Sequence, residues 1–162
     1  MNDERTTRLD RMRFTKNKMS ANLALLAIIF NVCFFINIYE SDVGSWYYTI
    51  LVGGSILYNL IFMLAAFLSS EGIKNYKIGY SYLMIVLGII QIVRIFIYPM
   101  KAHGAVVTIQ EQAVTVMEGG QFIRVVLYLV LSAACLFAGA IVGIIRSRAL
   151  AGHLATLESK VA

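Results

Sequence analysis

The segment that decides the fold covers residues 122–145 and reads FIRVVLYLVLSAACLFAGAIVGII. Its single charged residue, Arg124, lies near its start. A helix needs about 20 mainly apolar residues to cross a hydrocarbon core of ~30 Å. A helix of a soluble bundle would carry polar residues along one face. This segment is apolar on all sides, so we predict that it spans a membrane.

Three other segments pass the same test, namely residues 21–39, 48–68 and 78–98. Apolar residues make up 59% of the 162-residue chain and charged residues 14%, whereas soluble domains carry about 25% charge. The high hydrophobicity also excludes disorder. We therefore predict an all-α integral membrane protein with a four-transmembrane-helix bundle at residues 20–146. A basic leader, residues 1–19, and a tail, residues 147–162, flank it.

Basic residues predict the orientation of the bundle, because cytoplasmic loops carry an excess of Lys and Arg. With both termini in the cytoplasm, eleven basic residues lie on that side and two, Lys101 and Arg124, on the other. We therefore expect cytoplasmic termini and a bacterial cytoplasmic membrane. Contacts with anionic headgroups account for the net charge of +5, so no nucleic-acid partner is expected.

The leader and the tail each carry weak helical signals. In the leader, the apolar stripe of Leu9, Met12 and Phe14 is thin. A flexible leader is therefore favoured over an amphipathic helix that touches the membrane or a partner. The tail could continue the fourth helix, although Gly152 weakens that extension. Its three leucines fall at helical spacing: Leu150, Leu154 and Leu157.

The loop at residues 100–121 is longer than two antiparallel helices need. Within it, residues 106–117 are rich in β-branched side chains that partly alternate. This pattern predicts a short β-hairpin that turns near Gln110. A lone hairpin is marginal in water, so it should rest on the bundle or on another protein. An irregular loop on the headgroups is the alternative. The expected contact residues are Thr108, Gln110, Gln112 and Thr115.

Five polar residues lie within the predicted spans: Asn31, Asn37, Asn59, Gln91 and Arg94. Amides in hydrocarbon seek partners, and interhelical hydrogen bonds of this kind contribute about 0.6–2 kcal/mol. We expect Asn31 to pair with Asn59, or either of them with Gln91. Arg94 should reach the outer headgroups or form an internal pair with Glu40 or Asp42. A role in a polar pathway is the alternative.

Small residues form a stripe on the fourth predicted span. Cys135, Gly139 and Gly143 recur at i, i+4 and i+8, so they share one helix face. Such a face lets two helix backbones approach closely. It can serve packing inside the bundle or the docking of another chain, and the sequence leaves both open.

Several types of functional residue are missing from the sequence, and their absence narrows the range of possible functions. No Asp or Glu lies inside a predicted span, which disfavours a proton-coupled transporter. His103 and His153 fall on opposite sides of the predicted membrane, and no motif for a nucleophile, a metal or a cofactor is present. We therefore expect no cofactor and no catalysis, and an enzyme acting on lipids is the least supported class.

Two functions remain. The first is a non-catalytic accessory or structural subunit of a larger membrane complex such as a transporter. It would act by helix packing and outer-loop contacts with other integral membrane subunits. The alternative is a small homo-oligomeric channel or transporter with an outer polar vestibule around Arg94.

Overall fold

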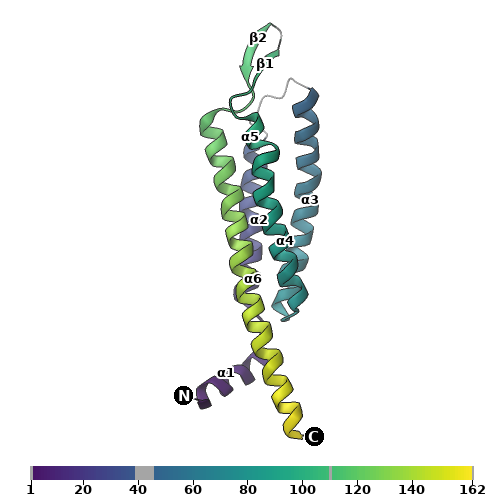
Figure 1. Cartoon of the computed structure of the whole chain (residues 1–162), viewed down its shortest axis with the longest axis vertical. Coiled ribbons are helices and arrows are strands. Elements are labelled where there is room, and N and C mark those ends of the chain that lie inside the picture. The colour runs from purple at the N-terminus through teal and green to yellow at the C-terminus, as the bar shows by residue number, and fades with distance from the viewer. Residues whose placement is uncertain (1, 39–45, 110, 162) are drawn as a thin grey trace.

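Four long helices dominate the computed structural model, which describes residues 2–38, 46–109 and 111–161 (Figure 1). They are α2 (Lys18–Ile38), α3 (Trp46–Lys74), α4 (Ile78–Ile97) and α6 (Gly119–Val161). Each contains a segment long and apolar enough to cross a membrane. The prediction of four such helices is confirmed.

Two of the helices extend well beyond the predicted spans. Helix α3 continues to Lys74, where an ion pair of 2.7 Å joins Lys74 to Glu71 in the last turn. Helix α6 has 43 residues and includes almost all of the predicted tail. At a rise of about 1.5 Å per residue, α6 is roughly 65 Å long, about twice the thickness of a hydrocarbon core.

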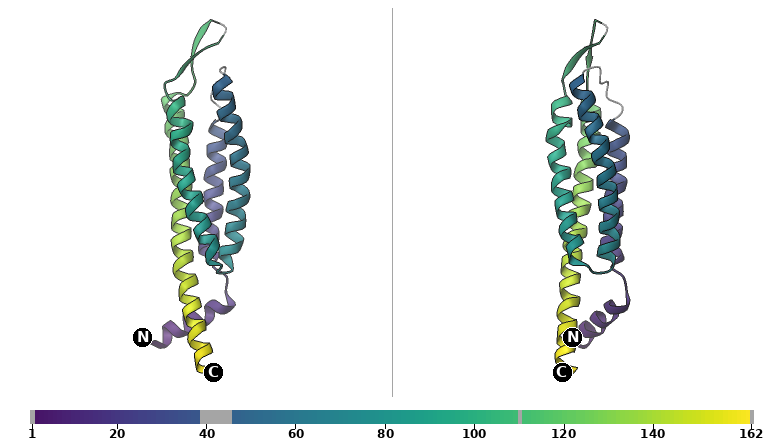
Figure 2. Two further views of the ribbon diagram at one scale, coloured as in Figure 1. Left: turned by 45° about the vertical axis from the view of Figure 1, so that its right-hand side comes forward. Right: turned by 90° about the vertical axis from the view of Figure 1, so that its right-hand side faces the viewer.

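The four helices run nearly side by side along one axis (Figure 2). Helix α6 packs extensively against α2 and α4, α3 packs against α2, and the contact between α3 and α4 is the sparsest of these four. One apolar core cluster contains Ala24, Phe62 and Leu136, and a second contains Phe34 and Leu129. On each of the four long helices, buried polar residues lie between the two clusters: Asn31, Asn59, Gln91, Arg94 and Ser132.

The predicted hairpin is also confirmed. Strands β1 (Val106–Ile109) and β2 (Gln112–Thr115) pair antiparallel, with Val106 opposite Thr115. A short helix, α5 (Pro99–Ala102), connects α4 to the hairpin and begins with proline, which suits a first helical turn. Val116 and Met117, which follow β2, are buried in the second core cluster. The hairpin is therefore anchored to one end of the bundle, the hairpin end.

At the opposite end, the termini end, residues of the leader form helix α1 (Asn2–Phe14). The leader is thus helical where a flexible segment was favoured. Helix α1 crosses α6 (Figure 1) and is held by a contact of 2.7 Å between Asp10 and His153. Leu9 and Met12 are half-buried, whereas Phe14 is 86% exposed. The thin stripe suffices because the extended α6 gives it a surface to pack on.

Asn17 joins three helices at the termini end. Its side chain is fully buried. Its backbone N–H donates to the Lys74 carbonyl at 2.9 Å, and its Nδ2 donates to Ser20 Oγ at 3.0 Å. Its Oδ1 accepts from Arg146 of α6 at 3.0 Å. One asparagine therefore fixes the start of α2 against the end of α3 and against α6.

Candidate functional site

Arg94 lies at the centre of a polar network inside the bundle. Its Nη1 donates to Asn31 Oδ1 at 3.0 Å and to Gln91 Oε1 at 2.8 Å. Its Nη2 donates to Ser55 Oγ at 3.0 Å and to Asn59 Oδ1 at 2.9 Å. Both hydrogens on each terminal nitrogen are thus used, and the acceptors come from α2, α3 and α4.

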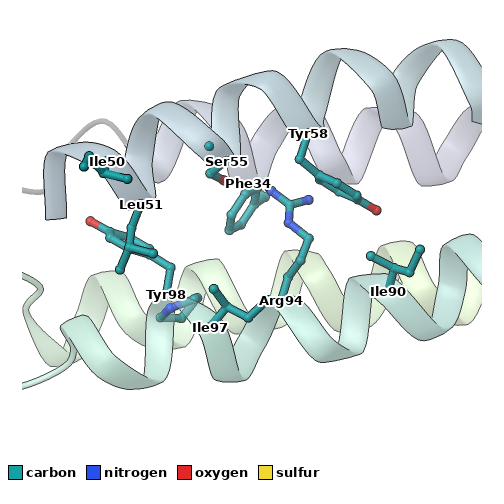
Figure 3. A pocket seen from close by; sticks show the side chains of 11 residues that line it. Phe34, Ile50, Leu51, Ser55, Tyr58, Ile90, Arg94, Ile97 and Tyr98 are labelled. Carbon is teal, nitrogen blue, oxygen red and sulfur yellow. Dashed lines mark hydrogen bonds between the residues drawn. The ribbon is translucent and has the colours of Figure 1, made fainter. Parts of the chain in front are cut away.

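Two aromatic rings cover the faces of the Arg94 guanidinium. Its Cζ lies 4.4 Å from the centroid of Phe34 and 4.3 Å from that of Tyr58. Both distances fit cation–π contacts. Figure 3 shows the guanidinium pointing from α4 towards α3, close to these rings. We call Arg94, its four acceptors and the two rings the arginine cage.

The cage decides how Arg94 is accommodated. The side chain is 7% exposed and bonds inside the bundle. Snorkelling to the headgroups, one of the two expected outcomes, is therefore wrong. The other expectation, an internal ion pair, named Glu40 and Asp42, which lie outside the described residues. Within the described part of the chain, the partners of Arg94 are neutral oxygen atoms and rings.

Gln91 extends the network to the fourth helix. Its Nε2 donates to Asn31 Oδ1 at 3.0 Å and to Ser132 Oγ at 3.2 Å. The Ser132 hydroxyl in turn donates to the Ala27 carbonyl at 2.9 Å. The cage and this extension connect all four long helices by side-chain hydrogen bonds at one level of the bundle.

The cage leaves two amide donors without a partner. Asn31 Nδ2 and Asn59 Nδ2 are buried and form no hydrogen bond with any described residue. The amide oxygens must face Arg94, because a guanidinium carries donors and no acceptor. Burying an unsolvated charge in hydrocarbon costs more free energy than burying an unpaired amide N–H. The amides are therefore oriented to bond to the cation, and their own N–H groups are left without a partner.

A cavity of about 340 Å³ adjoins the cage between α3 and α4 (Figure 3). This is near the lower end of the range of about 300–1,000 Å³ for small-molecule sites. Its walls are mainly apolar and include Ile50, Leu51, Ile90 and Ile97, with Arg94, Ser55 and Tyr58 as polar members. Such walls suit an apolar chain or a neighbouring helix.

Asn37 is the predicted polar residue that does not join the cage. It lies towards the hairpin end, where its Nδ2 donates to the Cys33 carbonyl at 2.8 Å. Its Oδ1 accepts from Arg124 Nε at 3.1 Å, and its carbonyl accepts from Gln121 at 2.8 Å. The structure therefore brings together four of the five predicted residues: Asn31, Asn59, Gln91 and Arg94.

The small-residue stripe of α6 faces the interior. A Cβ added at Gly143 would overlap Ile73 Cδ1, and one added at Gly139 would lie 2.6 Å from Met84 Cε. Cys135 packs against the first core cluster. Of the two uses left open, packing within the chain matches this geometry, because helices of the same bundle already occupy the face.

The predicted contact residues of the hairpin are accessible where the structure describes them. Thr108, Gln112 and Thr115 are exposed, and Gln110 lies outside the described residues. They do not share one face. Thr108 and Thr115 point to one side of the two-stranded sheet, and Gln112 points to the other.

Sequence reasoning missed two members of the network, Ser55 and Ser132. Ser55 precedes Asn59 by four residues, so the two share a helix face. Ser132 precedes Cys135 by three residues and extends the small-residue stripe. Spacing relative to a recognised polar or small residue was the signal that could have identified both.

Known proteins offer no guide to this site. No family model matches the chain, and neither a curated protein nor a solved structure is similar to it. Among the described residues, no group of three His, Cys, Asp or Glu side chains could hold a metal ion. The function must therefore be argued from the residues themselves.

Proposed function

We propose that the chain is a non-catalytic accessory subunit that contacts a larger membrane protein through one face of its hairpin. The observation that carries this proposal is an exposed, uncharged sheet face. It consists of Val106, Thr108, Ala113 and Thr115, all exposed, with Val106 at 62%. We call these four residues the hairpin face.

The strand register places these residues together. Val106 pairs with Thr115 and Thr108 with Ala113, and directly paired residues lie on the same side of a sheet. Val107 and Val114 lie on the other side and are half-buried, and Val107 packs against the second core cluster. The side opposite the hairpin face therefore contacts the bundle through Val107, whereas all four residues of the hairpin face are exposed.

The anchoring of the hairpin supports a contact role. Val116 donates its backbone N–H to the Ala105 carbonyl at 2.9 Å, directly below the strands. Its side chain is 1% exposed, as is that of Met117. An isolated two-stranded sheet is marginally stable, and this anchor fixes its orientation, so little order needs to be gained on binding.

The alternative, a homo-oligomeric channel around Arg94, has less support from the geometry. A vestibule would need polar groups that face water, whereas Arg94 uses both terminal nitrogens in bonds to the bundle. Asn37, the polar span residue towards the hairpin end, bonds to Arg124 and does not join Arg94. We therefore retain the accessory role and propose no conduction pathway.

The orientation belongs to the same proposal. Figure 1 shows both termini at one end of the bundle and the hairpin at the other. Eleven basic residues flank the spans at the termini end, and two flank them at the hairpin end. The positive-inside bias favours cytoplasmic termini, so the hairpin would meet its partner on the outer side of the membrane. A bacterial cytoplasmic membrane is part of the same proposal.

A photo-crosslinking residue at position 108 tests the contact in native membranes. Position 112 is the matched control, because it is also exposed but points to the opposite side of the sheet. We expect position 108 to give one discrete adduct with a larger membrane protein, and position 112 to give little. Mild detergent extraction should then recover the same protein in stoichiometric amount.

Two results would reject the proposal. Adducts between copies of this chain alone would favour the homo-oligomer. Equal adducts at both positions, or none, would show that the hairpin face has no specific partner.

A further inference from the structure

A second cavity, of about 460 Å³, lies at the termini end between α1 and α6. Four of its lining residues are basic and none is acidic. The basic residues are Arg8, Arg11, Lys16 and Arg146. We call this cavity the basic pocket.

The basic pocket combines charge with an apolar wall. Leu9 and Met12 of α1 and Ile145 and Ala149 of α6 line it beside the four cations. In the sequence, Ile145 ends the apolar segment of α6 and Arg146 begins its charged part. The pocket therefore lies where α6 leaves the hydrocarbon core.

The four cations are not neutralised by ion pairs within the described part of the chain. None forms an ion pair with another described residue, and Asp10, the nearby acid on α1, contacts His153. Arg146 is held in place by Asn17 at 3.0 Å and by Met19 Sδ at 3.8 Å. Like charges gathered in this way repel one another, and a bound anion would relieve that repulsion.

We propose that the basic pocket binds the phosphate headgroup of an anionic phospholipid from the adjacent leaflet. Charge complementarity selects an anion, and Arg side chains suit phosphate because they donate two parallel hydrogen bonds. The apolar wall and the position at the membrane boundary select a lipid over a soluble phosphate. By joining cations of α1 and α6, the lipid also fixes α1 across α6. This inference does not depend on the hairpin contact.

Native mass spectrometry of the full chain, released from nanodiscs with equal phosphatidylglycerol and phosphatidylcholine, tests the proposal. We expect wild type to retain phosphatidylglycerol preferentially. The triple variant R8Q/R11Q/K16Q should lose that preference by about tenfold or more, because it removes three of the four cations that can donate to a phosphate in the pocket. The variant R8K/R11K keeps the charges and should retain most of it.

The matched control is R13Q/K18Q/K77Q. It removes the same charge from exposed residues at the same end, none of which lines the pocket. It should keep the preference within about twofold, because none of these three side chains can donate to a headgroup held in the pocket. Circular dichroism should show the same helix content in all variants.

Three results would overturn the proposal. The first is an equal loss in both triple variants, which would indicate diffuse attraction to the membrane. The second is displacement of phosphatidylglycerol by millimolar inorganic phosphate, which would indicate a soluble-phosphate site. The third is no lipid preference in wild type.

Discussion

At the residue scale, Arg94 shows how neutral groups can bind a buried cation: its partners within the described residues are amide and hydroxyl oxygens and aromatic rings. Four neutral oxygens accept from its terminal nitrogens and two rings cover its faces. Hydrogen bonds to charged groups contribute about 1.5–3 kcal/mol each, roughly twice as much as neutral ones. Several such bonds connect the charge to three helices. The cage therefore stabilises the buried charge and also joins these helices to one another.

The cage predicts that Asn59 and Arg94 are energetically coupled. Replacing Asn59 by Leu removes an acceptor from a charged donor, and we expect the free energy of unfolding to fall by about 1.5–3 kcal/mol. In an Arg94→Met background the same change should cost less than about 1 kcal/mol, since the donor is gone. Reversible unfolding in mixed micelles measures both.

Asn37→Leu is the control for this double-mutant cycle, because Asn37 bonds to Arg124 and Cys33 and lies outside the cage. Its effect should be the same with and without Arg94. Equal costs for Asn59→Leu in both backgrounds would show that the bond between Asn59 and Arg94 contributes nothing to stability.

The sequence predicted which amides seek partners but not where Arg94 would point. Asn31, Asn59 and Gln91 stand out because amides are rare in apolar segments. The direction of Arg94 depends on the rotation of α4 relative to α2 and α3, which one helix does not reveal. Ser55 and Ser132 do not stand out in the sequence, because serine is small and its hydroxyl can bond to the backbone of its own helix.

At the element scale, α6 is the helix around which the others assemble. It packs against α2 and α4, and it supports α1 beyond the spans. Gly139 and Gly143 bring its backbone close to its neighbours. The nearest atoms to an added Cβ at Gly143 are Ile73 Cδ1, which it would overlap, and Ser81 Oγ at 2.6 Å.

We therefore expect Gly143→Ala to destabilise the bundle by about 1–3 kcal/mol, the usual effect of overpacking. Ile73→Val removes the closest atom, so it should cost less in the Gly143→Ala background than in wild type. Gly53→Ala is the control: no atom lies within 4 Å of its added Cβ. It should be neutral or stabilising by up to about 1 kcal/mol. The same unfolding assay measures all four variants. If Gly143→Ala left the free energy of unfolding unchanged, close approach of the helix backbones at Gly143 would not be needed for stability.

Local patterns predicted the spans and the hairpin, because continuous hydrophobicity and β-branched alternation are properties of the segments themselves. They did not predict helix α1 or the full length of α6. The apolar stripe of α1 and the leucines of the tail are each weak alone. In the structure they support each other, through the contact between Asp10 and His153 and the half-buried Leu9 and Met12. Such mutual support between segments far apart in sequence cannot be read from either segment.

At the scale of the whole molecule, the hairpin end and the termini end should lie on opposite sides of the membrane. Cysteines at position 75, between α3 and α4, and at position 112, in β2, report on the two sides, because both residues are exposed. We expect a membrane-impermeant thiol reagent added to intact cells to label position 112 and not position 75. Labelling of position 75 alone would reverse the orientation.

Background labelling is the control for this experiment. The natural cysteines, Cys33 and Cys135, are half-buried within the spanning helices α2 and α6. The unmodified chain should therefore react little in intact cells. Permeabilised cells should show labelling at both introduced positions, which proves that each is reactive.

The chain order of the arginine cage has a consequence for biogenesis. A ribosome makes Asn31, Ser55 and Asn59 before it makes helix α4, so the three acceptors on α2 and α3 already exist when Arg94 emerges. If helix α4 inserted into the lipid alone, the charge of Arg94 would raise the free energy of insertion markedly. Entering beside α2 and α3 removes much of that cost. The order of the helices along the chain therefore suits an order of membrane integration in which the helices with the acceptors insert before the helix with the cation.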